Sequence, residues 1–133
     1  MNTWIMPCNV SIFNIVEHFE VEDEMYWLGT QATDVGDIIY LYVGKPFSEI
    51  KYKCEVIDCQ IDEQIIQQSN YDVLKKDSKR RKNFIKIKMI QRYPLGIFPF
   101  HTLMQHGLVS VQSQMRISSE LIKYLQENER GNE

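Results

Sequence analysis

Two aromatic residues stand beside predicted loops, where a ring can face a ligand. Trp27 precedes a loop that runs to Val35, and Tyr71 lies in an otherwise polar segment with no helical or strand period. An aromatic face that stacks on a nucleobase contributes about 1–3 kcal/mol. We predict stacking roles for Trp27 and Tyr71, with core packing of Trp27 as the alternative. Trp4, inside an apolar run, is predicted to be core.

Polar side chains near the same loops could read the edge of a base. The Asn9 amide, at the end of the first apolar run, offers both a donor and an acceptor, although an asparagine there is equally an ordinary turn residue. Thr30 and Ser48 could donate to a base or a phosphate. The predicted ligand-binding set is completed by Cys8 and Leu74.

The net charge of −3 conceals a basic segment. Most acidic residues precede residue 75, whereas residues 75–92 hold nine bases against Asp77 alone: Lys75, Lys76, Lys79, Arg80, Arg81, Lys82, Lys86, Lys88 and Arg92. A local basic patch can attract phosphates, and such binding weakens with salt. We predict nucleic-acid backbone contacts at Lys79, Arg80, Arg81, Lys82, Lys86 and Lys88. The alternative is a solvated loop followed by a strand whose lysines face water.

Patterns for catalysis are missing from the sequence. His18, His101 and His106 are scattered, no serine or cysteine sits in a nucleophile elbow, and no glycine loop could cradle phosphates. Cys54 and Cys59 are five residues apart, whereas tetrahedral metal sites need tighter ligand clusters. We therefore expect no enzymatic activity, no metal and no cofactor.

The length of 133 residues suits one domain over residues 1–133, and 44% hydrophobic residues suffice for a core. No run approaches the roughly 18 apolar residues of a membrane span, and the first residues do not resemble a signal peptide. An odd count of three cysteines favours reduced thiols in a cytoplasmic setting. Residues 126–133 are expected to be a polar tail or the start of a linker.

Hydrophobic periodicity predicts the elements that position these residues. Strands are expected over residues 3–8, 25–28, 38–43, 50–61, 83–92 and 109–111, and helices over 12–19, 100–106 and 118–125. Ser11 is the expected N-cap of the first helix, and residues 61–74 are expected to be loop or short helix. Consecutive strands without crossover helices argue for a mixed or antiparallel barrel rather than a doubly wound sheet.

Several short motifs resemble the EVE domain, a family of the PUA-like superfamily that is close kin to the YTH domains. They are Trp4-Ile5 with Asn9, Met25-Tyr26-Trp27, Val35-Gly36-Asp37-Ile38-Ile39-Tyr40-Leu41-Tyr42, Asn70-Tyr71-Asp72, Ile97-Phe98-Pro99-Phe100 with Leu103, and Met115-Arg116-Ile117-Ser118. Residues 50–57 and 84–90 fall where the family has strands. The order and spacing of the motifs carry the resemblance.

The resemblance implies an α+β fold, a strongly curved, mixed β-barrel with flanking helices. It also implies a pocket for a modified base flipped out of DNA or RNA, which is a methylated adenine in YTH domains and a modified cytosine or adenine in EVE domains. Trp27 matches the family's cage tryptophan. Residues 44–49 lack the family's His-Ser and no proline follows Asp72, which leaves the modification open.

We therefore predict a cytoplasmic reader of a modified base, methylated or hydroxymethylated cytosine or methyladenine, that acts in restriction or defence. Modified DNA is favoured over RNA as the partner, and no membrane partner is expected. Any nuclease activity would lie on a fused domain or an associated subunit. The alternative is a PUA-like module that binds RNA or a small ligand without reading a modification.

Overall fold

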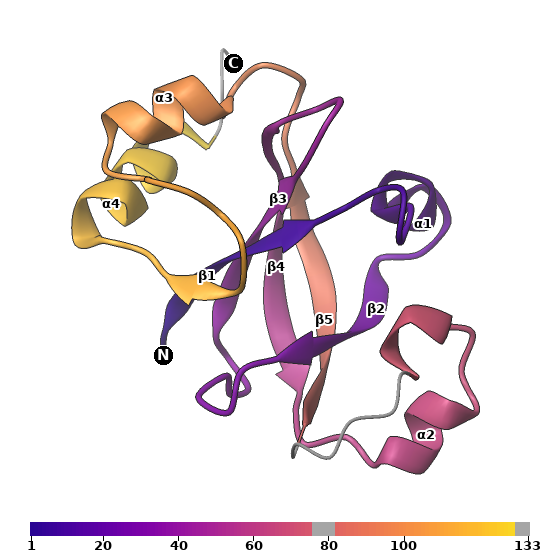
Figure 1. Cartoon of the computed structure of the whole chain (residues 1–133). Coiled ribbons are helices and arrows are strands. Elements are labelled where there is room, and N and C mark those ends of the chain that lie inside the picture. The colour runs from indigo at the N-terminus through magenta and orange to yellow at the C-terminus, as the bar shows by residue number, and fades with distance from the viewer. Residues whose placement is uncertain (76–81, 130–133) are drawn as a thin grey trace.

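The computed structural model describes residues 1–75 and 82–129 (Figure 1). Its sheet has six strands in the order β2-β5-β4-β3-β1-β6. The strands are β1 (Thr3–Cys8), β2 (Glu24–Gly29), β3 (Ile38–Val43), β4 (Glu49–Asp58), β5 (Asn83–Arg92) and β6 (Met115–Arg116). The helices are α1 (Ile15–Val21), α2 (Glu63–Gln67), the 3₁₀ turn η1 (Asp72–Leu74), α3 (Phe100–Gln105) and α4 (Ser119–Asn128).

The sheet is mixed and curls into a half-barrel. β1 runs parallel to β3, whereas β1–β6, β2–β5, β3–β4 and β4–β5 are antiparallel. A parallel pair needs a crossover connection, and here the crossover contains α1 and β2. β2 lies at the far edge of the sheet beside β5 (Figure 1). The predicted α+β fold, a curved mixed barrel with flanking helices, is confirmed.

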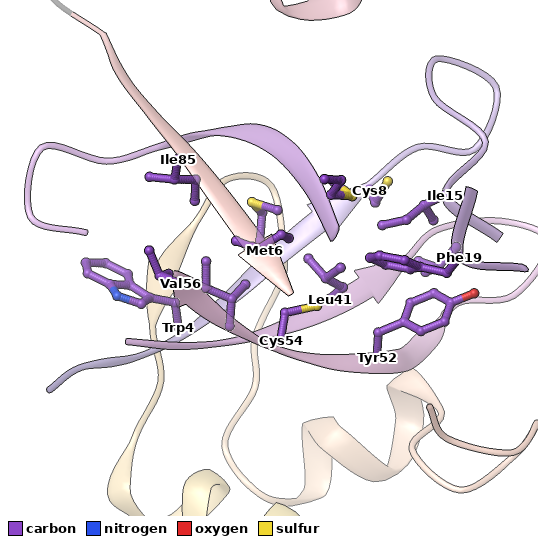
Figure 2. Close-up of a cluster of buried hydrophobic side chains, with 14 residues drawn as sticks. Trp4, Met6, Cys8, Ile15, Phe19, Leu41, Tyr52, Cys54, Val56 and Ile85 are labelled. Carbon is purple, nitrogen blue, oxygen red and sulfur yellow. The ribbon is translucent and has the colours of Figure 1, made fainter. Parts of the chain in front are cut away.

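Both faces of the central strands are buried. Figure 2 shows the core inside the curve of the sheet, where side chains from β1, β3, β4, β5 and α1 point toward one another. This inner core consists of Trp4, Met6, Cys8, Ile15, Phe19, Met25, Ile39, Leu41, Val43, Tyr52, Cys54, Val56, Ile85 and Ile87. Trp4 is 4% exposed, so its predicted place in the core is confirmed.

A second core covers the opposite face of the sheet, where α3 and α4 pack. It contains Ile5, Tyr40, Ile50, Tyr93, Phe98, Leu103, Leu108, Leu121 and Leu125. Consecutive residues along β1 therefore point into different cores, and the same holds along β3. Strands that are buried on both faces appear in a sequence as continuous apolar runs rather than as an alternating pattern, which explains the runs at residues 3–8 and 38–43.

The start of the first helix was predicted wrongly. α1 begins at Ile15, and its N-cap is Asn14, whose Oδ1 accepts a hydrogen bond from the Glu17 N–H at 3.2 Å. Ser11 instead donates its hydroxyl to Asn9 Oδ1 at 2.7 Å, in a turn that precedes the helix. Ile12, expected on the apolar helix face, is 63% exposed.

The last strand was also predicted wrongly. Residues 109–111 form no strand, and Val109 is 84% exposed. β6 lies instead at Met115–Arg116, where Met115 pairs with Ile5 and Arg116 pairs with Trp4. A β-branched pair of residues favours a strand only when an open sheet edge is within reach. The strand that pairs with the edge of β1 therefore begins at residue 115 rather than at residue 109.

The other predicted elements are confirmed within a few residues. β5 occupies the predicted range, with Ile85 and Ile87 buried in the inner core while Lys86 and Lys88 share the opposite face. β3 and β4 are antiparallel neighbours as expected. Residues 61–74 contain the short helix α2 and the turn η1. In the described part of the chain, no helix is both long enough and apolar enough to cross a membrane.

The three cysteines form no disulfide among themselves. Cys8 and Cys54 are buried in the inner core, and Cys59 is half-buried. Burial raises the pKa of the Cys8 thiol to about 12 and raises that of Cys54 as well. At neutral pH both core thiols are therefore protonated and unreactive.

One buried carboxylate ties the N-terminus to the sheet. Asp37 is 2% exposed, and its oxygens accept hydrogen bonds from the Asn2 N–H and the Trp4 indole N–H, each at 2.9 Å, and from the Asp34 N–H at 3.0 Å. Burial alone would raise the pKa of this carboxyl group, but the three hydrogen bonds and the N-terminal charge lower it below its usual value. Asp37 therefore holds β1 in register beside β3.

We expect the variant Asp37→Asn to lower the free energy of unfolding at pH 7 by about 1–3 kcal/mol, because its NH₂ group would face N–H donors. The lowered pKa gives wild type a stabilisation that is present above the unfolded-state value of about 3.9 and is lost as the pH falls through the folded-state value. Urea unfolding at pH 7 and below pH 4 should show the difference between the proteins narrowing. Asp34→Asn, with an exposed side chain, is the control; an equal loss in both variants would contradict the assignment.

Candidate functional site

An open cleft of about 950 Å³ lies between α1, the start of β2 and residues 69–71. It is lined by Phe13, His18, Phe19, Glu20, Val21, Glu22, Asp23, Glu24, Met25, Tyr26, Ser69, Asn70, Tyr71 and Lys86. Pockets for small molecules usually measure about 300–1,000 Å³. The cleft therefore has room for a nucleobase or a metabolite of similar size.

Tyr71 is the centre of the aromatic wall of this cleft. Its ring is stacked on Phe13 at 5.7 Å between centroids, and it meets the rings of Tyr26 at 5.5 Å and His18 at 5.9 Å edge-on. Such offset and edge-to-face pairs are favourable ring geometries. The four rings form one cluster, although Tyr71 is about 45 residues from Tyr26 in the chain.

The Tyr71 loop is held against an edge strand. β2 pairs with β5 on one side only, and the Tyr71 hydroxyl forms a hydrogen bond with the Tyr26 backbone. Burial raises the pKa of Tyr71 while this hydrogen bond opposes the rise. Within the loop, Ser69 Oγ accepts from the Tyr71 N–H at 3.2 Å and donates to the Ile66 carbonyl at 2.6 Å. These bonds fix the position of the Tyr71 ring.

Phe13 and His18 reach the cleft because of how α1 begins. Phe13 directly precedes the Asn14 N-cap, and its ring lies 5.5 Å from that of His18, the fourth residue of the helix. This is the position of a hydrophobic staple, and Asn14 followed by Glu17 has the spacing of a capping box. That pattern is the signal in the sequence that could have identified both residues.

The remainder of the lining is rich in carboxylates. Glu20, Glu22 and Asp23 are exposed at the α1–β2 connection, and Glu24 opens β2. Lys86 Nζ lies 3.1 Å from Glu24 Oε1 and 5.5 Å from the centroid of the Tyr26 ring. The hydrogen bond with Glu24 raises the pKa of Lys86. The cleft is therefore acidic overall, and its lysine is already engaged by a carboxylate and a ring.

The two predicted stacking residues occupy different positions. Tyr71 lines the cleft. Trp27 lies behind it: its ring is 5.2 Å from Phe13, and it packs against both the inner core and the small cluster of Ile66, Leu74 and Phe84. Trp27 therefore contacts the site through Phe13, and the predicted residue Leu74 belongs to the same packing layer.

Two further predicted ligand residues lie at a separate small cavity. Cys8 and Asn9 line a space of about 220 Å³ together with Pro7, Tyr42, Gly44, Lys45 and Val111. The Asn9 side-chain oxygen is already bonded to the Ser11 N–H and hydroxyl. Ser48 forms a hydrogen bond with Tyr42, one of the lining residues.

Thr30 takes part in a network of hydrogen bonds around Asn83, the first residue of β5. Its carbonyl accepts from the Asn83 amide at 2.8 Å, and its hydroxyl lies 3.0 Å from that of Thr33. Asn83 is fully buried and also bonds the Thr33 carbonyl and the Gln60 N–H. The predicted ligand set is thus divided among the cleft, the small cavity and this network.

The structure describes only some of the residues that were predicted to contact a nucleic-acid backbone. Lys86 lines the cleft, and Lys88 is exposed two residues later on the same face of β5. Lys82 Nζ lies 5.7 Å from the centre of the Phe84 ring. Lys79, Arg80 and Arg81 lie outside the residues that the structure describes. Among residues 1–75 and 82–129, no group of three or more His, Cys, Asp or Glu side chains could hold a metal ion.

No family model matches the sequence, and no curated protein matches it. Solved structures do match the fold. A hypothetical protein from Leishmania major has a TM-score of 0.68 at 17% identity, covering 100% of this chain and 98% of its own. The ASCH protein from Zymomonas mobilis has a TM-score of 0.67 at 9% identity over 95% of this chain and 94% of its own.

A protein from Pseudomonas putida is similar, with a TM-score of 0.65 at 16% identity over 94% of this chain and 97% of its own. ASCH domains are members of the PUA-like superfamily, so the predicted PUA-like fold is confirmed. At these identities the likeness concerns the fold, and the residues of the cleft have to be judged on their own chemistry.

The position of Trp27 between two clusters predicts a stability effect. We expect Trp27→Ala to lower the free energy of unfolding by about 2–4 kcal/mol, because a large side chain is removed from packed surroundings. Tyr71→Phe removes only a hydroxyl and its hydrogen bond, and should cost about 1 kcal/mol. Urea unfolding followed by circular dichroism measures both. A Trp27→Ala variant as stable as wild type would show that its ring is not a packing residue.

Proposed function

We propose that this protein binds nucleic acid and takes one unpaired or flipped base into the cleft beside Tyr71. The observation that carries the proposal is the aromatic wall of Tyr71, Phe13 and Tyr26 in a cleft of about 950 Å³. A base has two π-faces, and stacking on aromatic side chains is the common means by which proteins hold unpaired bases. The PUA-like fold, together with the resemblance to EVE domains, supports the same function.

The polar residues of the lining suit the edge of a base. The Asn70 amide can donate and accept on one edge. Carboxylates such as those of Glu22 and Asp23 accept hydrogen bonds from exocyclic amino groups, as Glu and Asp do with cytosine N4. Adenine, cytosine and guanine carry such amino groups on the Watson–Crick edge, whereas uracil and thymine carry none. We therefore infer a preference for bases with an exocyclic amino group.

The strand itself would run outside the cleft. Phosphates are repelled by the carboxylates of Glu20, Glu22 and Asp23, so only the base can enter. Lys88, on the exposed face of β5 and opposite Glu24 in the strand pairing, offers positive charge beside the opening. In this arrangement Lys88 supplies attraction for the backbone and the cleft supplies selection of the base.

The finer form of the proposal is a reader of modified bases of the EVE type, which carries no catalytic function and serves restriction or defence together with a nuclease on another domain or subunit. A modified base is cheaper to extrude where it is mismatched or already single-stranded. The alternative in the same fold is a module that binds RNA or a small ligand without reading a modification.

A panel of oligonucleotides tests this function. We expect single-stranded and mismatched targets to bind more tightly than perfect duplexes, and Tyr71→Ala to weaken binding by about 1–3 kcal/mol through the loss of stacking. Fluorescence polarisation with labelled DNA and RNA measures the affinities. Tyr71→Phe keeps the ring and is the matched control, with nearly unchanged binding. Equal weakening in both variants, or no effect of either, would exclude stacking on Tyr71.

Lys88 provides an independent test of the backbone path. Lys88→Gln should weaken all sequences alike and make the plot of log affinity against log salt shallower by about 0.7–0.9, the value for one phosphate contact. Lys123→Gln removes the same charge from α4, which contributes no residue to the cleft, and should leave the slope unchanged. An unchanged slope in Lys88→Gln would place the nucleic-acid backbone elsewhere.

A further inference from the structure

The charge of the cleft points to a narrower class of ligand. We propose that the cleft selects a base that carries a positive charge, such as the N-methylated bases 1-methyladenine and 3-methylcytosine. This inference rests on the proposed binding of a base in the same cleft. Three features of the cleft support it: the aromatic rings, the number of carboxylates, and the position of Lys86. The ammonium group of Lys86 already lies beside a carboxylate and an aromatic ring.

The charges of the cleft lining favour a cationic ligand. Four carboxylates line the cleft, from Glu20, Glu22, Asp23 and Glu24, and Lys86 is the single lysine or arginine among the described lining residues. Lys86 is paired with Glu24, and Glu22 Oε2 lies 3.7 Å from Nε2 of His18, which also lines the cleft and is charged only when protonated. Beside a neutral His18, the charges of Glu20, Glu22 and Asp23 are not compensated within the lining. A cationic ligand gains from this field, a neutral ligand gains little, and an anionic ligand is repelled.

The aromatic wall of the cleft also favours a cationic ligand. The face of a tyrosine or phenylalanine ring attracts a cation through its quadrupole, and this attraction is the basis of aromatic cages for methylated ammonium groups. Tyr26, Tyr71 and Phe13 line the cleft, and each is half-buried, so part of each ring is open to the cleft. A methylated cationic base would stack on these rings more strongly than its neutral form.

Lys86 is a cation that the cleft already holds in this way. Its ammonium group lies 3.1 Å from Glu24 Oε1 and 5.5 Å from the centre of the Tyr26 ring. The pKa of Lys86 is raised, chiefly by the hydrogen bond with Glu24. One cation is thus already stabilised in the cleft by a carboxylate and a ring. The same kinds of group, Tyr71 with Glu22 and Asp23, are available to a ligand beside it.

The test uses two isomers with the same atoms and different charge. At pH 7, 1-methyladenosine is cationic and N6-methyladenosine is neutral. Single-stranded RNA oligonucleotides of one sequence would carry 1-methyladenosine, N6-methyladenosine or adenosine at the same position, and fluorescence polarisation would measure the affinities. We expect the 1-methyladenosine oligonucleotide to bind at least tenfold more tightly than the other two. A DNA set with the same modifications distinguishes the two sources of the base.

The double variant Glu22→Gln, Asp23→Asn tests the carboxylates. Both side chains are exposed, so folding should be unaffected. We expect the preference for the cationic base to fall to within about threefold, with little change for adenosine. The matched control Glu63→Gln, Glu127→Gln removes the same charge from exposed positions on α2 and α4, and should keep the preference.

The outcomes separate the two levels of the argument. Binding of adenosine or N6-methyladenosine as tight as that of 1-methyladenosine would overturn the selection of a cation and leave the base-binding function standing. A preference that survives in Glu22→Gln, Asp23→Asn, or that is lost equally in the control, would overturn the role of these carboxylates. Failure of every RNA and DNA oligonucleotide to bind, including the case where a trimethyl-lysine peptide binds instead, would overturn the proposed function itself.

Discussion

The parallel pairing of β1 with β3 dictates the path of the chain between these two strands. Parallel neighbours cannot be joined by a tight turn, so the chain must leave the sheet after Cys8 and return along another path before Ile38. α1 and β2 make up that path, and β2 lies at the sheet edge beside β5. The Asp37 carboxylate secures the pairing by binding the backbone of Asn2 and the indole of Trp4. The cleft exists because this crossover passes over the open side of the half-barrel, bringing Phe13, His18 and Tyr26 to the loop of Tyr71.

The aromatic cluster links the site to the stability of the fold. Phe13 contacts Tyr71 on the cleft side and Trp27 on the core side, at 5.7 Å and 5.2 Å between ring centroids. Rings in contact rarely contribute additively, so a substitution of one ring in this cluster should also change the packing of its neighbours. Trp27 precedes a loop, as a ligand-stacking residue would, but its contacts with Phe13 and with two packing clusters hold it behind the cleft.

Positive and negative charges lie on different surfaces around the cleft. The exposed side of β5 carries Lys88, whereas the α1–β2 connection carries carboxylates into the cleft. Between them lies the ion pair of Lys86 with Glu24, from neighbouring strands. A polyanion that approaches the lysines would meet like charge at the cleft, which keeps its phosphates outside and favours the entry of a base. A uniformly basic surface would not impose this division.

The fold class, most of the strands and the core position of Trp4 could be predicted from the sequence, because these depend on local patterns: apolar runs, alternation in residues 83–92 and turn residues between them. Tyr71 was also indicated, as a large ring without a packing period. Which residues meet depends on the tertiary structure. Whether Val109 or Met115 finds the free edge of β1, and whether Trp27 or Tyr26 faces the cleft, depends on how the crossover and the loops pass over the sheet. Such contacts join residues tens of positions apart, and their spacing in the chain carries no signal of their distance in space.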